Sequence, residues 1–74
     1  MRVGEVWKLK NLSFLYLSDY IRGEYVKIKQ ITHNPNSKKD LVLYDCLPDD
    51  SFKKPYPGGM DRERFLKEYE KYKD

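Results

Sequence analysis

The residues whose types and spacing point most clearly to chemistry lie on one short stretch. Tyr25, Lys27 and Lys29 alternate with Val26 and Ile28, so in a strand they share one face. Lysines contact phosphates by charge, and aromatic rings stack on exposed bases. With the neighbouring cations, the candidate nucleic-acid-binding residues are Arg22, Tyr25, Lys27, Lys29, Lys38 and Lys39. The alternative is the solvated, lysine-rich face of an antiparallel sheet.

A second candidate surface follows in the chain and is acidic and aromatic. The segment 40–52 carries four aspartates and no base, and a Tyr- and Pro-rich segment follows at 52–57. Such segments suit docking on a partner protein, including the case of a phage-encoded inhibitor on a host protein. The candidate protein-interaction residues are Asp49, Asp50, Phe52 and Tyr56.

The distribution of charge is compatible with either partner. The net charge is +3, which permits a nucleic acid or an acidic protein and demands neither. Residues 22–39 carry five bases and one acid, and the acidic segment follows directly. We therefore expect the excess positive charge around a central hairpin.

Catalysis, metal binding and cofactor binding have little support in the residues. His33 has no recognisable partner in the sequence, and Cys46 ends an apolar strand, where cysteine usually behaves as a small hydrophobe. One His and one Cys fall short of the roughly four ligands of a structural zinc site. No Gly-rich phosphate-binding loop is present. We expect a protein that is not an enzyme, with no metal and no cofactor.

Short strands dominate the pattern of apolar residues. We expect strands in 2–10, 14–21, 24–32 and 41–46, with a β-bulge near Lys29–Gln30 because Ile28 and Ile31 are odd-spaced. The stretch 33–40 reads as a loop, and 47–59 as irregular with a short edge strand near 52–54. Trp7 is expected to anchor the core; the alternative is a platform for a ligand.

The chain ends in a pattern typical of a helix, expected over about 61–73. Asp61 is a good N-cap, and Met60 and Phe65 have the spacing of a hydrophobic staple. Phe65, Leu66, Tyr69 and Tyr72 form one apolar stripe at helical spacing. We expect this stripe to close a small barrel; the alternative is a helix that binds a partner.

The chain resembles the short, uncharacterised bacterial and phage SH3-like domains. The resemblance covers roughly residues 20–72 and is carried by "RGEYVKI" at 22–28, "DLVLYDC" at 40–46 and "KPYPGGMDRERFLKEY" at 54–69. The long link at 47–59 and the longer last helix depart from that pattern. The resemblance implies a fold and no catalytic residues: a mainly β, small SH3-like barrel of four to five antiparallel strands closed by a C-terminal α-helix.

Length and cysteine content limit the expected number of domains and the expected cellular compartment. We expect the 74 residues to form a single domain, compatible with a monomer or a homodimer. One cysteine cannot form an internal disulfide, and no apolar run approaches the length of a membrane span. We therefore expect a cytoplasmic binding module with no membrane association.

Overall fold

A computed structural model of the chain describes residues 1–36, 39–48 and 53–73. Five antiparallel strands form one sheet in the order β4-β3-β2-β1-β5. The elements in chain order are β1 (Val6–Leu9), the 3-10 helix η1 (Leu12–Tyr16), β2 (Tyr25–Asn34), β3 (Lys39–Cys46), β4 (Tyr56–Asp61), α1 (Arg62–Glu68) and β5 (Tyr69–Lys73). The expectation of a mainly β fold with a C-terminal helix is confirmed. The sheet is open, since β4 and β5 lie at its two edges.

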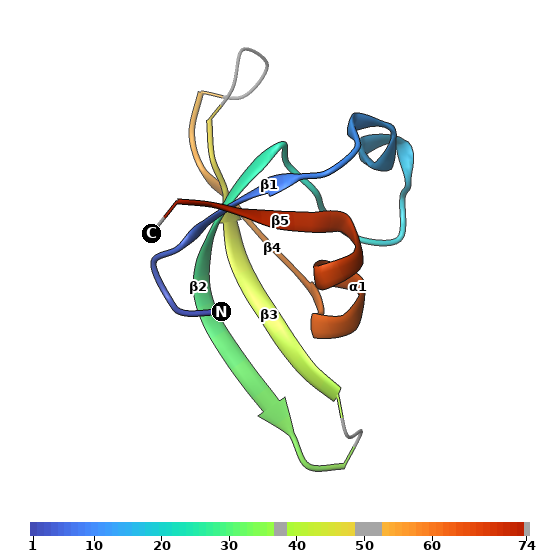
Figure 1. Ribbon diagram of the computed structural model, residues 1–74, viewed down its shortest axis with the longest axis vertical. Coiled ribbons are helices and arrows are strands. Elements are labelled where there is room, and N and C mark those ends of the chain that lie inside the picture. Colours follow the sequence, from blue (N-terminus) through green and yellow to red (C-terminus); the bar gives the residue numbers. More distant parts are fainter. Residues whose placement is uncertain (37–38, 49–52, 74) are drawn as a thin grey trace.

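The sheet is built from a meander and one returning strand. Strands β1 to β4 follow one another across the sheet, and β5 returns to pair with β1 (Figure 1). The longest hairpin, β2–β3, extends away from the rest of the molecule (Figure 1). The loop predicted at 33–40 is shorter in the structure, because β2 continues through Asn34 and β3 begins at Lys39.

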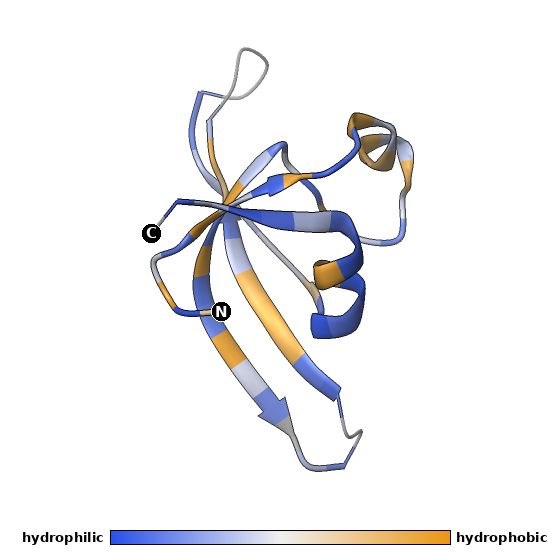
Figure 2. Cartoon of the chain, viewed as in Figure 1, coloured by the Kyte–Doolittle hydropathy of each residue, from blue (hydrophilic) through white to orange (hydrophobic). Residues whose placement is uncertain are grey.

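The core lies on the inner face of this sheet, under α1. Alternation places Val26, Ile28, Val42, Tyr44 and Cys46 inward, where each is at most 1% exposed. Figure 2 shows hydrophobic and polar segments in alternation along β2, and one continuous hydrophobic stretch on β3. The register of β2 against β3 shifts between Ile28 and Gln30, so the predicted bulge is confirmed.

Aromatic rings join the helix to the sheet. Phe65 is fully buried and stacks on Tyr69, with ring centroids 4.7 Å apart. Its ring also lies 5.3 Å from that of Trp7, which is 9% exposed, so the prediction of a core tryptophan is confirmed. The helix thus fills the space between the two sheet edges.

The start of α1 is as predicted, but its end is not. Asp61 caps the helix by accepting a hydrogen bond from the Arg64 amide at 3.1 Å. Met60 and Phe65, the predicted staple, are both fully buried. The prediction of a helix over 61–73 is wrong, because Tyr69 is extended and residues 69–73 pair with β1 instead. Backbone hydrogen bonds to β1 replace those of further helical turns.

The connection between β1 and β2, residues 10–24, is called the arm below. The strand predicted at 14–21 is wrong: the arm contains η1, whose cap Asn11 accepts from the Ser13 amide at 2.9 Å. No residue of η1 is buried, and Phe14 packs against the core at its edge. Figure 2 shows hydrophobic residues along this exposed segment.

The end of the arm is fixed by side chains from distant elements. Arg22 forms a bidentate pair with Glu68 of α1 at 2.6 and 2.9 Å. The Tyr69 hydroxyl donates to the Gly23 carbonyl at 2.8 Å, and the Tyr56 hydroxyl donates to the Arg22 carbonyl at 3.0 Å. These contacts satisfy polar groups in a segment that has no sheet partner of its own.

Candidate nucleic-acid interface

Three of the predicted residues share the outer face of the sheet. Val26 and Ile28 are buried, so their neighbours Tyr25 and Lys27 point to the opposite side. Lys29 lies at the bulge, and its Nζ is 3.7 Å from Asp45 Oδ1. Since Asp45 is the cross-strand partner of Lys27, all three side chains belong to this face.

The returning strand β5 adds an aromatic ring to the same face. The ring of Tyr72 meets that of Tyr25 edge to face, with centroids 5.0 Å apart. Tyr72 is 54% exposed although it belongs to the stripe predicted to be buried. The pair holds both rings at a fixed angle on the surface.

Two further lysines lie against these rings. The Nζ of Lys8 lies 5.7 Å from the Tyr25 ring centroid, and the Nζ of Lys73 lies 6.0 Å from that of Tyr72. Both distances suit a cation–π contact. We name the set the Tyr–Lys face; it consists of Lys8, Tyr25, Lys27, Lys29, Tyr72 and Lys73.

Carboxylates balance part of the charge of this face. Asp45 pairs with Lys29, and Glu70 is the cross-strand partner of Lys8. Within the described residues, Lys27 and Lys73 form no ion pair. These two lysines lie opposite Val6, one on each neighbouring strand. Two uncompensated positive charges therefore bracket Val6.

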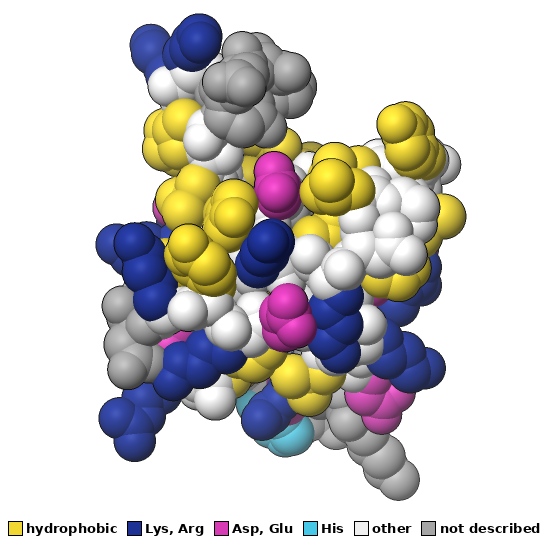
Figure 3. All heavy atoms as spheres, turned by 45° about the horizontal axis from the view of Figure 1, so that its top comes forward, with side chains coloured by type: hydrophobic (Ala, Val, Ile, Leu, Met, Phe, Trp, Pro, Cys, Tyr) yellow, Lys and Arg dark blue, Asp and Glu magenta, His cyan; other side chains and the backbone are white. Residues whose placement is uncertain are grey.

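A shallow, open hollow lies between these groups and is lined by Val6, Tyr25, Leu47, Pro48, Tyr72 and Lys73. The space-filling view shows hydrophobic and Lys or Arg side chains gathered side by side on the face toward the viewer (Figure 3). A surface that joins an exposed aromatic ring to neighbouring cations can bind flat apolar groups and anions together.

Two of the remaining predicted cations, Arg22 and Lys39, lie elsewhere. The side chain of Arg22 is 1% exposed and is bound to Glu68 and Asp19, so it is part of the interior and not of the surface. Lys39 lies at the start of β3, at the far end of the hairpin, beside Asp40 and Arg62. Lys38 lies outside the described residues. Three of the six residues predicted from the sequence, Tyr25, Lys27 and Lys29, therefore lie on one surface.

Sequence reasoning missed Lys8, Tyr72 and Lys73. The spacing of Phe65, Tyr69 and Tyr72 fits a helix, and this hid the strand in which Tyr72 lies. The available signal was the high strand propensity of tyrosine in the last five described residues. Pairing of β5 with β1, which no local pattern reveals, brings these side chains to Tyr25.

Of the four predicted protein-interaction residues, Tyr56 lies within the part of the chain that the structure describes. Asp49, Asp50 and Phe52 lie outside the described residues. Tyr56 is half-buried, and its hydroxyl donates to the Arg22 carbonyl, so it helps to hold the arm.

Other reactive groups form no catalytic arrangement among the residues described. His33 Nδ1 lies 2.7 Å from Asp40 Oδ1 on the exposed hairpin, and Arg62 donates to the same carboxylate at 3.3 Å. Cys46 is fully buried, and burial raises the pKa of its thiol to about 11, which keeps the thiol protonated at neutral pH. Within the described part of the chain, no cluster of three potential metal ligands occurs. None of its helices is long and apolar enough to cross a membrane.

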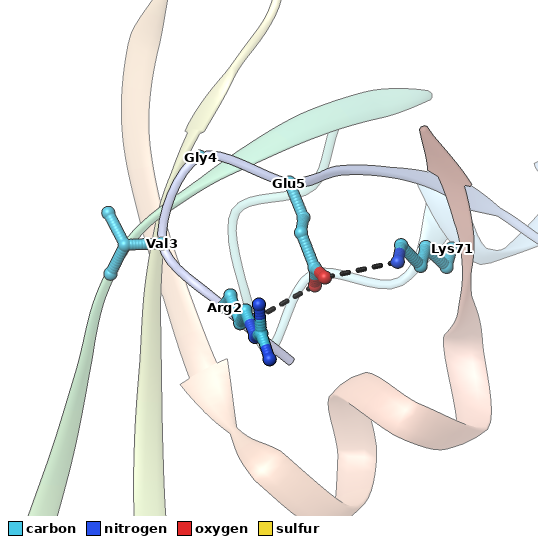
Figure 4. Close-up of a pocket in the computed structure, with 5 residues that line it drawn as sticks. All are labelled: Arg2, Val3, Gly4, Glu5 and Lys71. Carbon is cyan, nitrogen blue, oxygen red and sulfur yellow. Dashed lines mark hydrogen bonds and ion pairs between the residues drawn. The ribbon is translucent and has the colours of Figure 1, made fainter. Parts of the chain in front are cut away.

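A second hollow lies at the N-terminus and is lined by Arg2, Val3, Gly4, Glu5 and Lys71 (Figure 4). Glu5 accepts from the Arg2 amide at 2.9 Å and from the Trp7 indole at 3.2 Å, and Lys71 Nζ lies 3.2 Å from its other oxygen. The Arg2 amide and the other donors lower the pKa of Glu5 to about 2. These donors already occupy the carboxylate, so it serves to fix the N-terminal segment.

Comparison of the chain with protein-family models, curated proteins and solved structures gave no match.

Proposed function

We propose that the chain is a small, non-enzymatic binding module that binds nucleic acid through the Tyr–Lys face. The observation that carries the proposal is the pair of the half-buried Tyr25 and the exposed Tyr72, which lies on one surface among lysines from three strands. Binding to phosphates by lysine and to bases by aromatic rings are the two usual components of such recognition. Each component is weak alone, and their proximity makes a joint site.

We also propose that the fold is a small SH3-like barrel that is open between β4 and β5. The proposal is supported by the meander of four strands, the return of β5 to β1, and the position of α1 between the two edges. Phe65, which contacts Tyr69, Tyr44 and Trp7, fills the interior that a closed sheet would enclose. Hydrogen exchange of β4 and β5 amides tests this: edge amides without partners exchange faster than those of β2.

Fluorescence anisotropy with labelled oligonucleotides tests the nucleic-acid proposal. We expect binding at about 50 mM salt that weakens strongly by about 200 mM, because phosphate contacts release condensed cations. An unlabelled competitor of the same sequence should displace the probe. Absence of binding to single-stranded DNA, duplex DNA and RNA at the lower salt concentration would exclude this function.

A second candidate function is docking of a partner protein on the arm. One observation favours it: five large apolar side chains of the arm are 41–90% exposed, namely Leu12, Leu15, Tyr16, Leu17 and Ile21. Single exposed apolar residues are ordinary, but a group of this kind on so short a segment is typical of interaction sites.

The two candidates make opposite predictions for two variants. Leu15→Ser/Tyr16→Ser removes apolar surface from the arm and leaves the Tyr–Lys face intact. A protein partner that uses the arm would lose affinity for this variant and bind Lys27→Gln normally, with little dependence on salt. A nucleic acid bound on the Tyr–Lys face would show the reverse pattern.

A further inference from the structure

The hollow beside Tyr72 has a largely apolar lining, which suits a planar apolar group as well as a neighbouring phosphate. Val6, Tyr25, Leu47 and Pro48 supply apolar walls, and Tyr72 and Lys73 complete the rim. Tyr72 keeps more than half of its surface exposed while the edge-to-face contact with Tyr25 fixes its ring. A planar apolar group can therefore lie against a preoriented ring, at little cost in conformational entropy.

We propose that this hollow takes one unpaired base of a single-stranded nucleic acid, stacked on Tyr72. This inference rests on the proposed function and specifies its substrate class. The flanking phosphates contact Lys27 and Lys73, two lysines of the face that have no ion pair within the described residues. Both lie opposite Val6, so they bracket the hollow on neighbouring strands.

The lining favours a single strand over a duplex. In a duplex each base face is covered by its neighbours, so no face is free to stack on a tyrosine. A duplex would contact only the lysines, through its phosphates. The apolar walls and the exposed ring would then stay unused. In an unpaired strand, stacking on aromatic rings accepts every base, so we expect little sequence preference.

The test compares one tyrosine of the hollow with a matched tyrosine elsewhere. Tyr72→Ala removes the proposed stacking ring, and Tyr72→Phe keeps the ring without its hydroxyl. Tyr16→Ala is the control, because Tyr16 is 90% exposed and lies on the arm. Each protein is titrated against a labelled ten-nucleotide oligo-dT, an oligo-U of equal length and a duplex of equal length, with thermal melting to verify folding.

We expect Tyr72→Ala to weaken binding to the single strands by roughly tenfold or more, as for loss of one stacked base. Tyr72→Phe and Tyr16→Ala should stay within about twofold of the unmodified chain. Binding to the duplex should be weaker and insensitive to Tyr72→Ala. The oligo-dT and oligo-U titrations show whether the strand is DNA, RNA or either, since a 2′-hydroxyl contact separates them.

The outcomes separate the inference from the function on which it rests. If all probes bind with equal affinity and Tyr72→Ala changes none of them, the base-stacking inference is wrong while salt-dependent binding still supports the function. If no probe binds at low salt, both are wrong. Photo-crosslinking of a 5-bromouracil-substituted strand provides a direct check, because stacking predicts a crosslinked peptide that contains Tyr72.

Discussion

Arg22 and Glu68, 46 residues apart in the chain, form a bidentate ion pair in which both side chains are at most 2% exposed. The Nε–Oε1 and Nη2–Oε2 distances are 2.6 and 2.9 Å. Asp19 and Arg64 extend the pair into a network of four charges. This network fixes the arm to α1, since Arg22 also donates to the carbonyls of Leu17 and Tyr20.

Glu68→Gln should destabilise the fold by about 3–5 kcal/mol, because it leaves a buried guanidinium without its main counter-charge. Arg64→Ala, which removes the more exposed partner of the same carboxylate, should cost less than Glu68→Gln, because solvent screens an exposed partner. Chemical denaturation measures both. If Glu68→Gln does not fold, Arg22→Met/Glu68→Leu should restore folding, since no buried charge then remains. A small loss for Glu68→Gln would show that the pair is dispensable.

Stability should fall as the pH is lowered from about 4.5 to about 2. Hydrogen bonds lower the pKa of Glu5 from 4.5 to about 2, with the Arg2 amide as the largest cause. Burial opposes ionisation of Glu68, but its bonds to Arg22 and Arg64 outweigh burial and lower the pKa of its carboxyl. Both groups bind protons more readily in the unfolded chain, so acid favours unfolding.

Glu5→Gln isolates one of these groups. The difference in free energy of unfolding between the unmodified chain and Glu5→Gln should be largest above pH 4.5 and shrink toward pH 2. Urea denaturation at a series of pH values measures this difference. A difference that stays constant across this pH range would mean that folding does not lower the pKa of Glu5.

Lys27→Gln/Lys73→Gln should reduce both the affinity for a single strand and its salt dependence. Loss of two phosphate contacts lowers the slope of log K against log salt by roughly 1.4 for a single strand. Lys67→Gln is the matched control, because Lys67 is exposed on α1, away from the Tyr–Lys face. An effect of the control about half as large as that of the double variant would indicate a general charge effect without a defined site, since the control removes one charge and the double variant two.

Gly58→Ala should destabilise the fold more than Gly59→Ala. A Cβ at Gly58 would lie 2.7 Å from the buried ring of Tyr44 and 3.1 Å from the Ile21 carbonyl oxygen. The nearest atom to a Cβ at Gly59 is the end of the flexible, half-buried Leu43 side chain at 2.8 Å. We expect a loss of about 1–3 kcal/mol for Gly58→Ala. Thermal melting measures the stability of both variants. A larger loss of stability for Gly59→Ala than for Gly58→Ala would contradict this prediction.

Features that depend only on neighbouring residues can be predicted from the amino-acid pattern. Alternation of Val26 and Ile28 with Tyr25, Lys27 and Lys29 identified β2, its two faces and its bulge. Asp61 identified the start of α1, because a cap needs only the amides of the next turn. Lys27 and Lys29, two of the four lysines of the candidate site, followed from the same alternation.

The end of the helix and the composition of the candidate site depend on contacts between residues far apart in the chain. Residues 69–73 satisfy a helical spacing and a strand propensity alike, and pairing with β1 settles the choice in favour of β5. This pairing brings Tyr72 to Tyr25 across the sheet. Likewise, the sequence predicts Arg22 as a surface cation, whereas in the structure it is buried in an ion pair with Glu68. Contacts between residues far apart in the chain leave no local periodicity, so the sequence pattern could not predict them.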